Sequence, residues 1–146
     1  MSNLALRTNI HRLEDFLLEL PKEQQLDLDA LTKHHFAPGV YARELFIPKG
    51  TVLTGKIHKT EHLNIISQGK ISVATEDGPK LIEAPHIMVS KPGTKRAGYA
   101  HEDTTWITIH VTDETDLDKI EELVIAKGYD ELTYDAPKEI EQCHGE

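Results

Sequence analysis

Cysteine is almost absent from this chain of 146 residues, and long hydrophobic runs are missing altogether. The single cysteine, Cys143, excludes an internal disulfide framework and a thiolate metal cluster. No apolar run approaches the ~18 residues of a membrane span, and no basic-then-apolar leader opens the chain, so we expect no membrane association and a cytoplasmic location. Internal repeats and low-complexity tracts are also lacking, and one compact domain with short appendages is therefore expected.

Basic residues are the next shortage, because 16 lysines and arginines stand against 25 acidic residues. The net charge of −9 argues against binding to a nucleic-acid polymer, which needs basic surface to replace counterions. A small anionic ligand remains compatible with this charge, because a local basic cluster can exist on an acidic protein. Lys91, Lys95 and Arg96 form such a cluster around Pro92-Gly93.

The first 38 residues have the apolar spacing of helices. From Asn9, a candidate N-cap, apolar residues recur on one helical face until Pro21 ends the pattern. A weaker amphipathic segment extends to Leu31, and Pro38-Gly39 closes the region. We therefore predict an N-terminal helical extension over residues 1–38.

From residue 39 the pattern changes to short β-type runs separated by turn signals. Glycine and proline punctuate these runs, and no helix-length pattern interrupts them before residue 112. The pattern is typical of an all-β sandwich or barrel and argues against parallel βαβ folds. The predicted strands are 40–47, 56–66, 70–75, 80–82, 87–90 and 104–112.

The last part of the chain is predicted to hold one helix and an acidic tail. One-face apolar spacing indicates a helix over about residues 115–127, with Asp113 or Thr115 as its cap and Gly128 as its stop. The complete organisation is an N-terminal helical extension, a β-barrel, a C-terminal helix and a tail, at residues 1–38, 39–112, 113–128 and 129–146.

The segment from Gly55 to His62 is the strongest candidate site, because it holds two histidines within five residues. Side chains alternate along a strand, so His58, Thr60 and His62 are predicted to share one face. Two imidazoles on one face can hold a metal or act as paired proton-transfer groups.

The strand predicted at 104–112 carries a further histidine, His110. Alternation puts it on one face with Trp106 and Thr112. If a barrel closes this face over the strand of His58, His110 is the best third ligand beside His58 and His62. Zn, Fe, Mn or Ni sites typically need three protein ligands.

Two motifs within residues 40–112 resemble those of the cupin superfamily. The first cupin motif is a glycine, His-x-His, three or four residues, Glu, six residues and a glycine. Anchored on Gly69, its Glu position falls on His62 and its two His positions fall on Lys56 and His58. The second motif is Pro-x-Gly followed by a histidine, and that histidine position falls on Arg96.

This resemblance implies a cupin-type jelly-roll barrel with a small-molecule pocket on the face of His58. Because single-domain cupins commonly pair sheets, it also implies a homodimer or a higher homo-oligomer. Only one of the four metal-ligand positions keeps its usual residue, which leaves metal binding open.

The whole chain also resembles small cupin-like proteins encoded by tailed bacteriophages, with His34-His35-Phe36-Ala37-Pro38-Gly39-Val40-Tyr41-Ala42-Arg43 leading into the barrel. The resemblance implies a phage source, and hence a host-cytoplasmic location, more than it implies an activity. In that setting the expected ligand is a host metabolite or a nucleotide signal, including a cyclic nucleotide.

A second interpretation of the same histidines needs no metal. His58-Lys59-Thr60 and His110-Val111-Thr112 resemble the paired motifs of two-histidine phosphoesterases, in which one His is a base, the other an acid, and the Thr hydroxyls bind phosphate. That family alternates strands and helices, which residues 58–110 do not, so the likeness implies shared chemistry on a cupin scaffold. The protein is then a phosphodiesterase-like hydrolase with His58, Thr60, His110 and Thr112 as catalytic residues.

Cationic and aromatic residues supply the candidate ligand contacts. Arg96, whose planar fork matches phosphate or carboxylate, and Lys56 are predicted to clamp an anion. The alternative is that Arg96 pairs with a surface acid such as Glu44. Tyr99 and Trp106 are candidates to stack on a base or ring, or else are core or interface aromatics.

Three functional hypotheses follow from the sequence. The first is a cupin-fold pocket protein that binds, or also hydrolyses, a small anionic ligand. The second is a specific enzyme, either a metal-dependent cupin or a phosphodiesterase, and the third is a structural role in assembly. The deciding question is whether His110 lies within about 5 Å of His58, close enough to share a metal or one scissile group.

Overall fold

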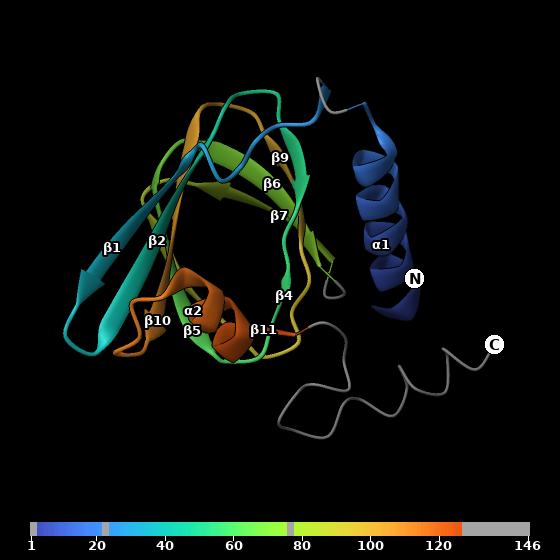
Figure 1. Cartoon of the computed structure of the whole chain (residues 1–146). Coiled ribbons are helices and arrows are strands. Elements are labelled where there is room, and N and C mark those ends of the chain that lie inside the picture. The colour runs from blue at the N-terminus through green and yellow to red at the C-terminus, as the bar shows by residue number, and fades with distance from the viewer. Residues whose placement is uncertain (1–2, 22–23, 76–77, 127–146) are drawn as a thin grey trace.

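Antiparallel strands dominate the computed structural model of the chain, which describes residues 3–21, 24–75 and 78–126 (Figure 1). One sheet has five strands in the order β1-β2-β10-β5-β8, and a second has four in the order β3-β9-β6-β7. A short ladder joins β11 to β4. Within the described ranges, no helix has the length and apolar character needed to cross a membrane.

The sheets are built from short elements. The five-stranded sheet contains β1 (Thr32–Ala37), β2 (Val40–Ile47), β10 (Thr104–Val111), β5 (His62–Gln68) and β8 (His86–Ser90). The four-stranded sheet contains β3 (Val52–Thr54), β9 (Ala97–Ala100), β6 (Lys70–Thr75) and β7 (Gly78–Glu83). The remaining elements are β4 (Ile57–His58), β11 (Ile125–Ala126), α1 (Asn3–Glu19) and α2 (Leu117–Val124). The predicted all-β core is confirmed, and so are a helix before it and a helix after it in the sequence.

The hydrophobic core lies between the two sheets. Ile47 and Ile66 come from the five-stranded sheet and pack with Ile71 and Ile82 of the four-stranded sheet, and each is at most 1% exposed. Every second side chain of a strand faces the same side, which is why these residues reach one layer. Burying one such side chain contributes roughly 2–3 kcal/mol, so the core fixes the separation of the two sheets.

Gly69 carries the chain from β5 in one sheet to β6 in the other. Its φ is +99°, and a Cβ at this position would lie 2.3 Å from the backbone oxygen of Asp103. Only glycine adopts this conformation in that space. The glycine on which the cupin motif was aligned is therefore required by the turn between the sheets.

The predicted helical extension over residues 1–38 is wrong in its second half. α1 begins at Asn3 instead of being capped at Asn9, because the leucines and alanine before Asn9 also favour a helix. Residues 24–31 form turns, and residues 32–37 form β1. With Pro38-Gly39 at the tip, β1 and β2 make an antiparallel hairpin. Backbone pairing with β2 overrides a weak helical spacing, and the barrel begins before residue 39.

The C-terminal helix is shorter than predicted. Asp116 caps α2 and accepts two backbone N–H groups of the first turn, whereas Asp113 and Thr115 lie outside the helix. The helix ends before Ile125 because that residue pairs with His58 across β11 and β4. The predicted acidic tail, residues 129–146, lies outside the described residues.

The strand predicted at 56–66 is divided in two by a bend at residues 59–61. β4 ends at His58 and pairs with β11, whereas β5 begins at His62 and enters the five-stranded sheet. The predicted shared strand face of His58, Thr60 and His62 is therefore wrong, and Thr60 is exposed. The two histidines meet across a bend.

The other five predicted strands are present. The strands at 40–47 and 70–75 have the predicted bounds, and those at 80–82, 87–90 and 104–112 differ from β7, β8 and β10 by at most two residues at either end. The prediction omitted β1, β3, β9 and β11, of which only β1 is longer than four residues.

Candidate metal centre

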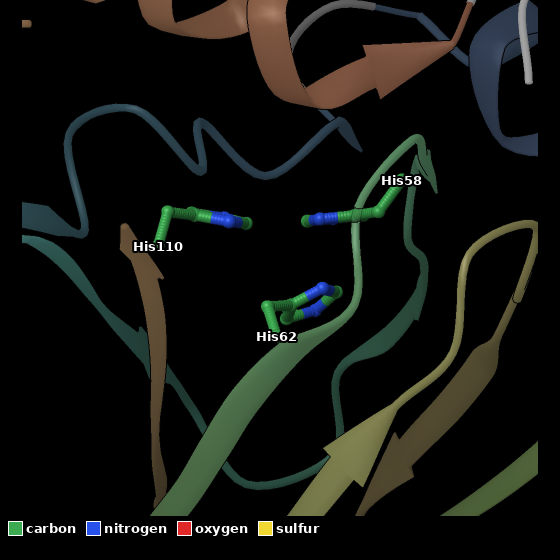
Figure 2. A group of neighbouring side chains, drawn as sticks. All are labelled: His58, His62 and His110. Carbon is green, nitrogen blue, oxygen red and sulfur yellow. The ribbon is translucent and has the colours of Figure 1, made fainter. Parts of the chain in front are cut away.

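Three histidine rings meet inside the barrel, at the end where α2 lies (Figures 1 and 2). His58 comes from β4, His62 from β5 and His110 from β10. The ring centroids are 4.3 Å apart for His58 and His62, 5.3 Å for His58 and His110, and 4.9 Å for His62 and His110. One ring nitrogen of each histidine lies within 4.8 Å of the other two. Figure 2 shows His58 and His110 pointing toward each other, with His62 beside them.

Strand register explains why His110 reaches this point. It pairs with Tyr41 of β2, and the two rings stack with centroids 6.2 Å apart. Tyr41 is 3% exposed and packs against Ile120 and Val124 of α2, so the helix holds this end of β2 and β10 in place. The predicted inward face of the strand 104–112 does lie over the side of the barrel that carries His58.

Burial keeps the three imidazoles neutral at physiological pH. Burial, together with the neighbouring imidazoles of His62 and His110 and smaller effects from nearby arginines, lowers the pKa of His58 to about 2. Burial likewise lowers the pKa of His110 to about 4. The pKa of His62 is also lowered by burial, although its hydrogen bond to the backbone of Thr60 opposes the shift. A neutral imidazole keeps the lone pair that binds metals.

The hydrogen bonds of the three rings leave nitrogens free to bind. His62 donates from Nδ1 to the carbonyl oxygen of Thr60 at 2.9 Å, so the lone pair of its Nε2 is available. The Nδ1 atoms of His58 and His110 are buried and have no hydrogen-bond partner among the described residues. Buried polar atoms are normally paired, so two unpaired nitrogens on the rings of one histidine cluster indicate a buried site that lacks a partner.

The three nitrogens fit a divalent metal ion. Metal–imidazole bonds of about 2.1 Å place tetrahedral ligand nitrogens about 3.4 Å apart. The nitrogens lie within 4.8 Å of one another, so small rotations of the side chains bring them to that spacing. Neutral imidazoles are ligands suited to Zn, Fe and Ni.

A cavity of about 120 Å³ adjoins the three histidines. Its wall includes His58 and His62, three cationic residues, and part of the hydrophobic core. No carboxylate lines it within the described part of the chain. The cationic residues are Arg43, Lys56 and Arg96.

Three of the four predicted ligand contacts lie in this wall, namely Arg96, Trp106 and Lys56. Arg96 donates to Ser90 Oγ at 2.6 Å, and its guanidinium carbon is 5.8 Å from the ring centroid of Trp106. The alternative prediction paired Arg96 with Glu44. In the structure Glu44 instead pairs with His35 at 3.0 Å. Lys56 also lines the cavity, but it forms an ion pair with Glu121 at the surface.

Four predicted site residues do not line the cavity, and one of them, His110, belongs to the histidine cluster beside it. Thr60 is exposed, and the hydroxyl of Thr112 accepts the backbone N–H of Glu114. Tyr99 is 44% exposed, and its ring meets His101 edge-on with centroids 5.0 Å apart. The structure therefore joins the histidines of the paired His-x-Thr triplets without their threonines.

Two polar residues of the cavity were missed by the sequence analysis. Arg43 shares the inward face of β2 with Tyr41 and Leu45, and Asn64 alternates with His62 along β5. The period-two alternation of both strands was the available signal. Alternation separates the two faces of each strand, but the face that points into the barrel can be identified only once the neighbouring strands are known.

Neither a protein-family model nor a curated protein sequence matches the chain, but solved structures do. KdgF from Halomonas sp. is 17% identical, with 67% of this chain and 94% of that chain covered and a TM-score of 0.51. A cupin superfamily protein from Desulfitobacterium hafniense DCB-2 is 15% identical, with 64% and 95% covered and a TM-score of 0.48. An acetylacetone dioxygenase from Acinetobacter johnsonii is 13% identical, with 55% and 58% covered and a TM-score of 0.46.

The fold is a cupin jelly roll. The jelly-roll fold predicted from the glycine-anchored motifs is confirmed, and at this level of identity the likeness carries the fold alone. The likeness to phage proteins stays a prediction. Within this cupin fold, the aligned ligand positions at Lys56 and Arg96 hold cations that pair with Glu121 and Ser90. His110, which lies outside both motifs, completes the histidine cluster.

Proposed function

We propose that this cupin-fold protein is metal-dependent, with one divalent ion held by His58, His62 and His110 beside a pocket for a small anionic metabolite. The observation that supports it best is the convergence of three neutral imidazoles, two of which have a buried nitrogen without a hydrogen-bond partner. Zn, Fe and Ni suit a set of three imidazoles better than Mn does. Such an ion, when bound, supplies Lewis-acid chemistry at its open coordination position.

The residues around the histidines would bind and orient the ligand. Arg43 and Arg96 bring positive charge to the cavity wall, and both are suited to a planar oxyanion. The core residues in the same wall exclude water, which strengthens these electrostatic contacts.

A metal-free phosphodiesterase is the weaker candidate for this site. Acid–base catalysis is most effective when the pKa of the catalytic group lies near the working pH. The pKa values of His58 and His110, about 2 and about 4, make both rings poor proton donors at neutral pH. The phosphate-binding threonines of that hypothesis also lie outside the cavity.

Metal analysis of protein purified without an affinity tag tests the proposal. We expect the protein, loaded with Zn, Fe(II) or Ni under reducing conditions and then dialysed, to retain about one ion per chain by mass spectrometry of the elements. His58→Ala and His110→Ala should each lose at least nine tenths of it. His101→Ala is the matched control, because His101 is exposed and lies outside the cluster.

Two results would contradict the metal proposal. The first is a folded wild-type protein that retains no Zn, Fe, Mn or Ni after loading. The second is cleavage of nucleotides by metal-free protein that His110→Ala abolishes, which would favour the phosphodiesterase. If neither metal nor any ligand depends on these histidines, a structural role becomes the better hypothesis.

A further inference from the structure

The cavity beside the histidines has two chemically different parts. One part of its wall is cationic, with the guanidinium groups of Arg43 and Arg96. The rest is largely aliphatic and belongs to the hydrophobic core, with no carboxylate among the described lining residues. The whole chain has a net charge of −9, so the positive charge of this wall is a local exception on an acidic protein. A wall of this kind favours an anion that also has an apolar body. The aliphatic lining residues that belong to the core between the sheets are Leu45, Ile47, Leu53, Ile71 and Val73, and Ala97 and Ile125 line the cavity beside them.

Arg96 is held in place by a chain of buried hydrogen bonds. Its Nη2 donates to Ser90 Oγ at 2.6 Å, and Asn64 Nδ2 donates to the same oxygen at 2.6 Å. Asn64 Oδ1 accepts in turn from Trp106 Nε1 at 2.9 Å. Asn64 and Ser90 are each 1% exposed, so the network is rigid and the charge of Arg96 is oriented in advance.

Arg43 has a different environment. Its side chain is half-buried in the cavity wall, and it makes no hydrogen bond or ion pair with any residue that the structure describes. Its positive charge is felt at His58 and His110 and, with a smaller effect than that of Lys56, at the carboxylate of Glu121, which is ion-paired with Lys56. Removing a charged group from water without a partner is unfavourable, and a bidentate carboxylate is the partner that a guanidinium matches best.

The size of the cavity limits the ligand. Its volume is about 120 Å³. An engineered apolar cavity of about 150 Å³ holds one benzene molecule with its six non-hydrogen atoms, so about five such atoms fill this one. A whole nucleotide is several times larger and would leave its base and sugar outside. Arg96 is already hydrogen-bonded to Ser90 and Lys56 is ion-paired with Glu121, so a second negative charge on the ligand would compete with these contacts.

We infer that the cavity binds a short-chain monocarboxylate whose carboxylate pairs with Arg43 and whose aliphatic body lies against Ile47, Ile71 and Val73. An acid of about three or four carbons fills the volume. Only the reaction that this acid would undergo rests on the proposed function, because the histidines that would hold the metal ion lie beside the cavity. Binding itself uses Arg43 and the apolar wall, and it therefore survives removal of the metal.

Titration of metal-free protein with butyrate, followed by two-dimensional NMR, tests this inference. We expect saturable shifts of the methyl signals of the cavity isoleucines and Val73, and none with butyramide, the neutral isostere. Arg43→Gln should weaken butyrate at least tenfold, and Arg43→Lys less so because it keeps the charge. The matched control is Arg12→Gln, which makes the same substitution on the exposed side of α1 and should change nothing.

Binding of butyrate and butyramide with equal affinity would overturn the inference, as would unchanged affinity in a folded Arg43→Gln. Tighter binding of inorganic phosphate or succinate than of butyrate would overturn the assignment to monocarboxylates. The metal content of the same samples separates the two proposals. Retained metal without butyrate binding refutes this inference alone, and Arg43-dependent butyrate binding without any metal refutes the metal centre alone.

Discussion

The three clustered histidines are buried without charge, and this makes the stability of the metal-free protein depend on pH. In an unfolded chain a histidine titrates near pH 6.5, whereas burial lowers the pKa of His58 to about 2 and of His110 to about 4. Between these values the unfolded state binds more protons than the folded state. Stability therefore falls as the pH drops below 6.5, and it is fully present above that value.

We predict that metal-free protein loses roughly 2 kcal/mol of unfolding free energy for each of these two histidines between pH 7 and pH 5. Urea unfolding after chelation, at the two pH values, measures the loss. The glutamine side chain of His110→Gln cannot be protonated in this range, so this variant should lose less unfolding free energy than the wild type between pH 7 and pH 5. Equal stability of the wild type at pH 7 and pH 5 would contradict neutral burial of the cluster.

Much of the site could be predicted from single residues and their alternation, but only inside continuous strands. The inward direction of Trp106 and His110 followed from the pattern of β10, and both reach the cavity side. Thr60 was misplaced because the chain bends between β4 and β5. Arg43 was missed because a lone arginine in an alternating strand gives no sign of which face is closed by the second sheet.

At the scale of elements, α1 is attached to the barrel through a buried cation. α1 lies beside β3 and β6 (Figure 1), and Glu14 on the helix accepts from Lys95 Nζ at 2.5 Å and from Thr54 Oγ1 at 3.1 Å. The side chain of Lys95 is only 4% exposed. A buried ion pair contributes little in total, but removal of one partner leaves a charge that is neither paired nor solvated.

We therefore predict that Glu14→Ala destabilises the protein by about 3 kcal/mol, because it leaves the ammonium group of Lys95 uncompensated. Glu19→Ala is the matched control, because it removes an exposed acid from the same helix and should change stability by less than about 0.5 kcal/mol. Urea unfolding of both variants at pH 7 gives the comparison. If the two variants are equally stable, α1 is not held to the barrel by this pair.

Elements were predictable where turn signals and alternation agreed with the later strand pairing. The hairpin of β1 and β2 shows where they did not, since residues 24–38 carry both a weak helical spacing and the turn residues Pro38-Gly39. Hydrogen bonds to β2 decide between helix and strand here, and a local sequence pattern carries no information about such a distant partner. The two-residue strand β11 was beyond prediction for the same reason, because its only partner is β4.

At the scale of the whole molecule, the outer face of the five-stranded sheet is apolar over β8, β5 and β10, whereas Glu44 lies on its β2 part. Leu63, Ile87 and Val89 are 44%, 66% and 53% exposed. Leu63 is flanked by Val89 and Ile109, and a second row sets Ile65 between Ile87 and Ile107. These six aliphatic side chains form one patch on β8, β5 and β10, which we call the outer patch.

A second copy of the chain is the occupant that fits the outer patch. The outer patch is the apolar part of the outer face of the five-stranded sheet. Five strands about 4.8 Å apart and about 20 Å long present roughly 500 Å² of flat sheet, so two such whole faces bury on the order of 1,000 Å². That area is enough for a specific, if modest, dimer interface. The patch is free of charge, and two negatively charged copies can approach there without the repulsion that the rest of their surfaces exerts.

The homodimer predicted from the cupin resemblance is therefore expected to form through the outer patch. Light scattering after size exclusion should give about twice the chain mass of 16.4 kDa at tens of micromolar. Val89→Lys should give monomers, because a two-fold axis through the patch would bring both new lysines into an apolar contact where neither is solvated. Leu81→Lys is the matched control, since Leu81 is 51% exposed on β7 of the other sheet and should leave the dimer intact. A monomeric wild type, or a dimer that only Leu81→Lys dissociates, would show that the outer patch does not join two copies.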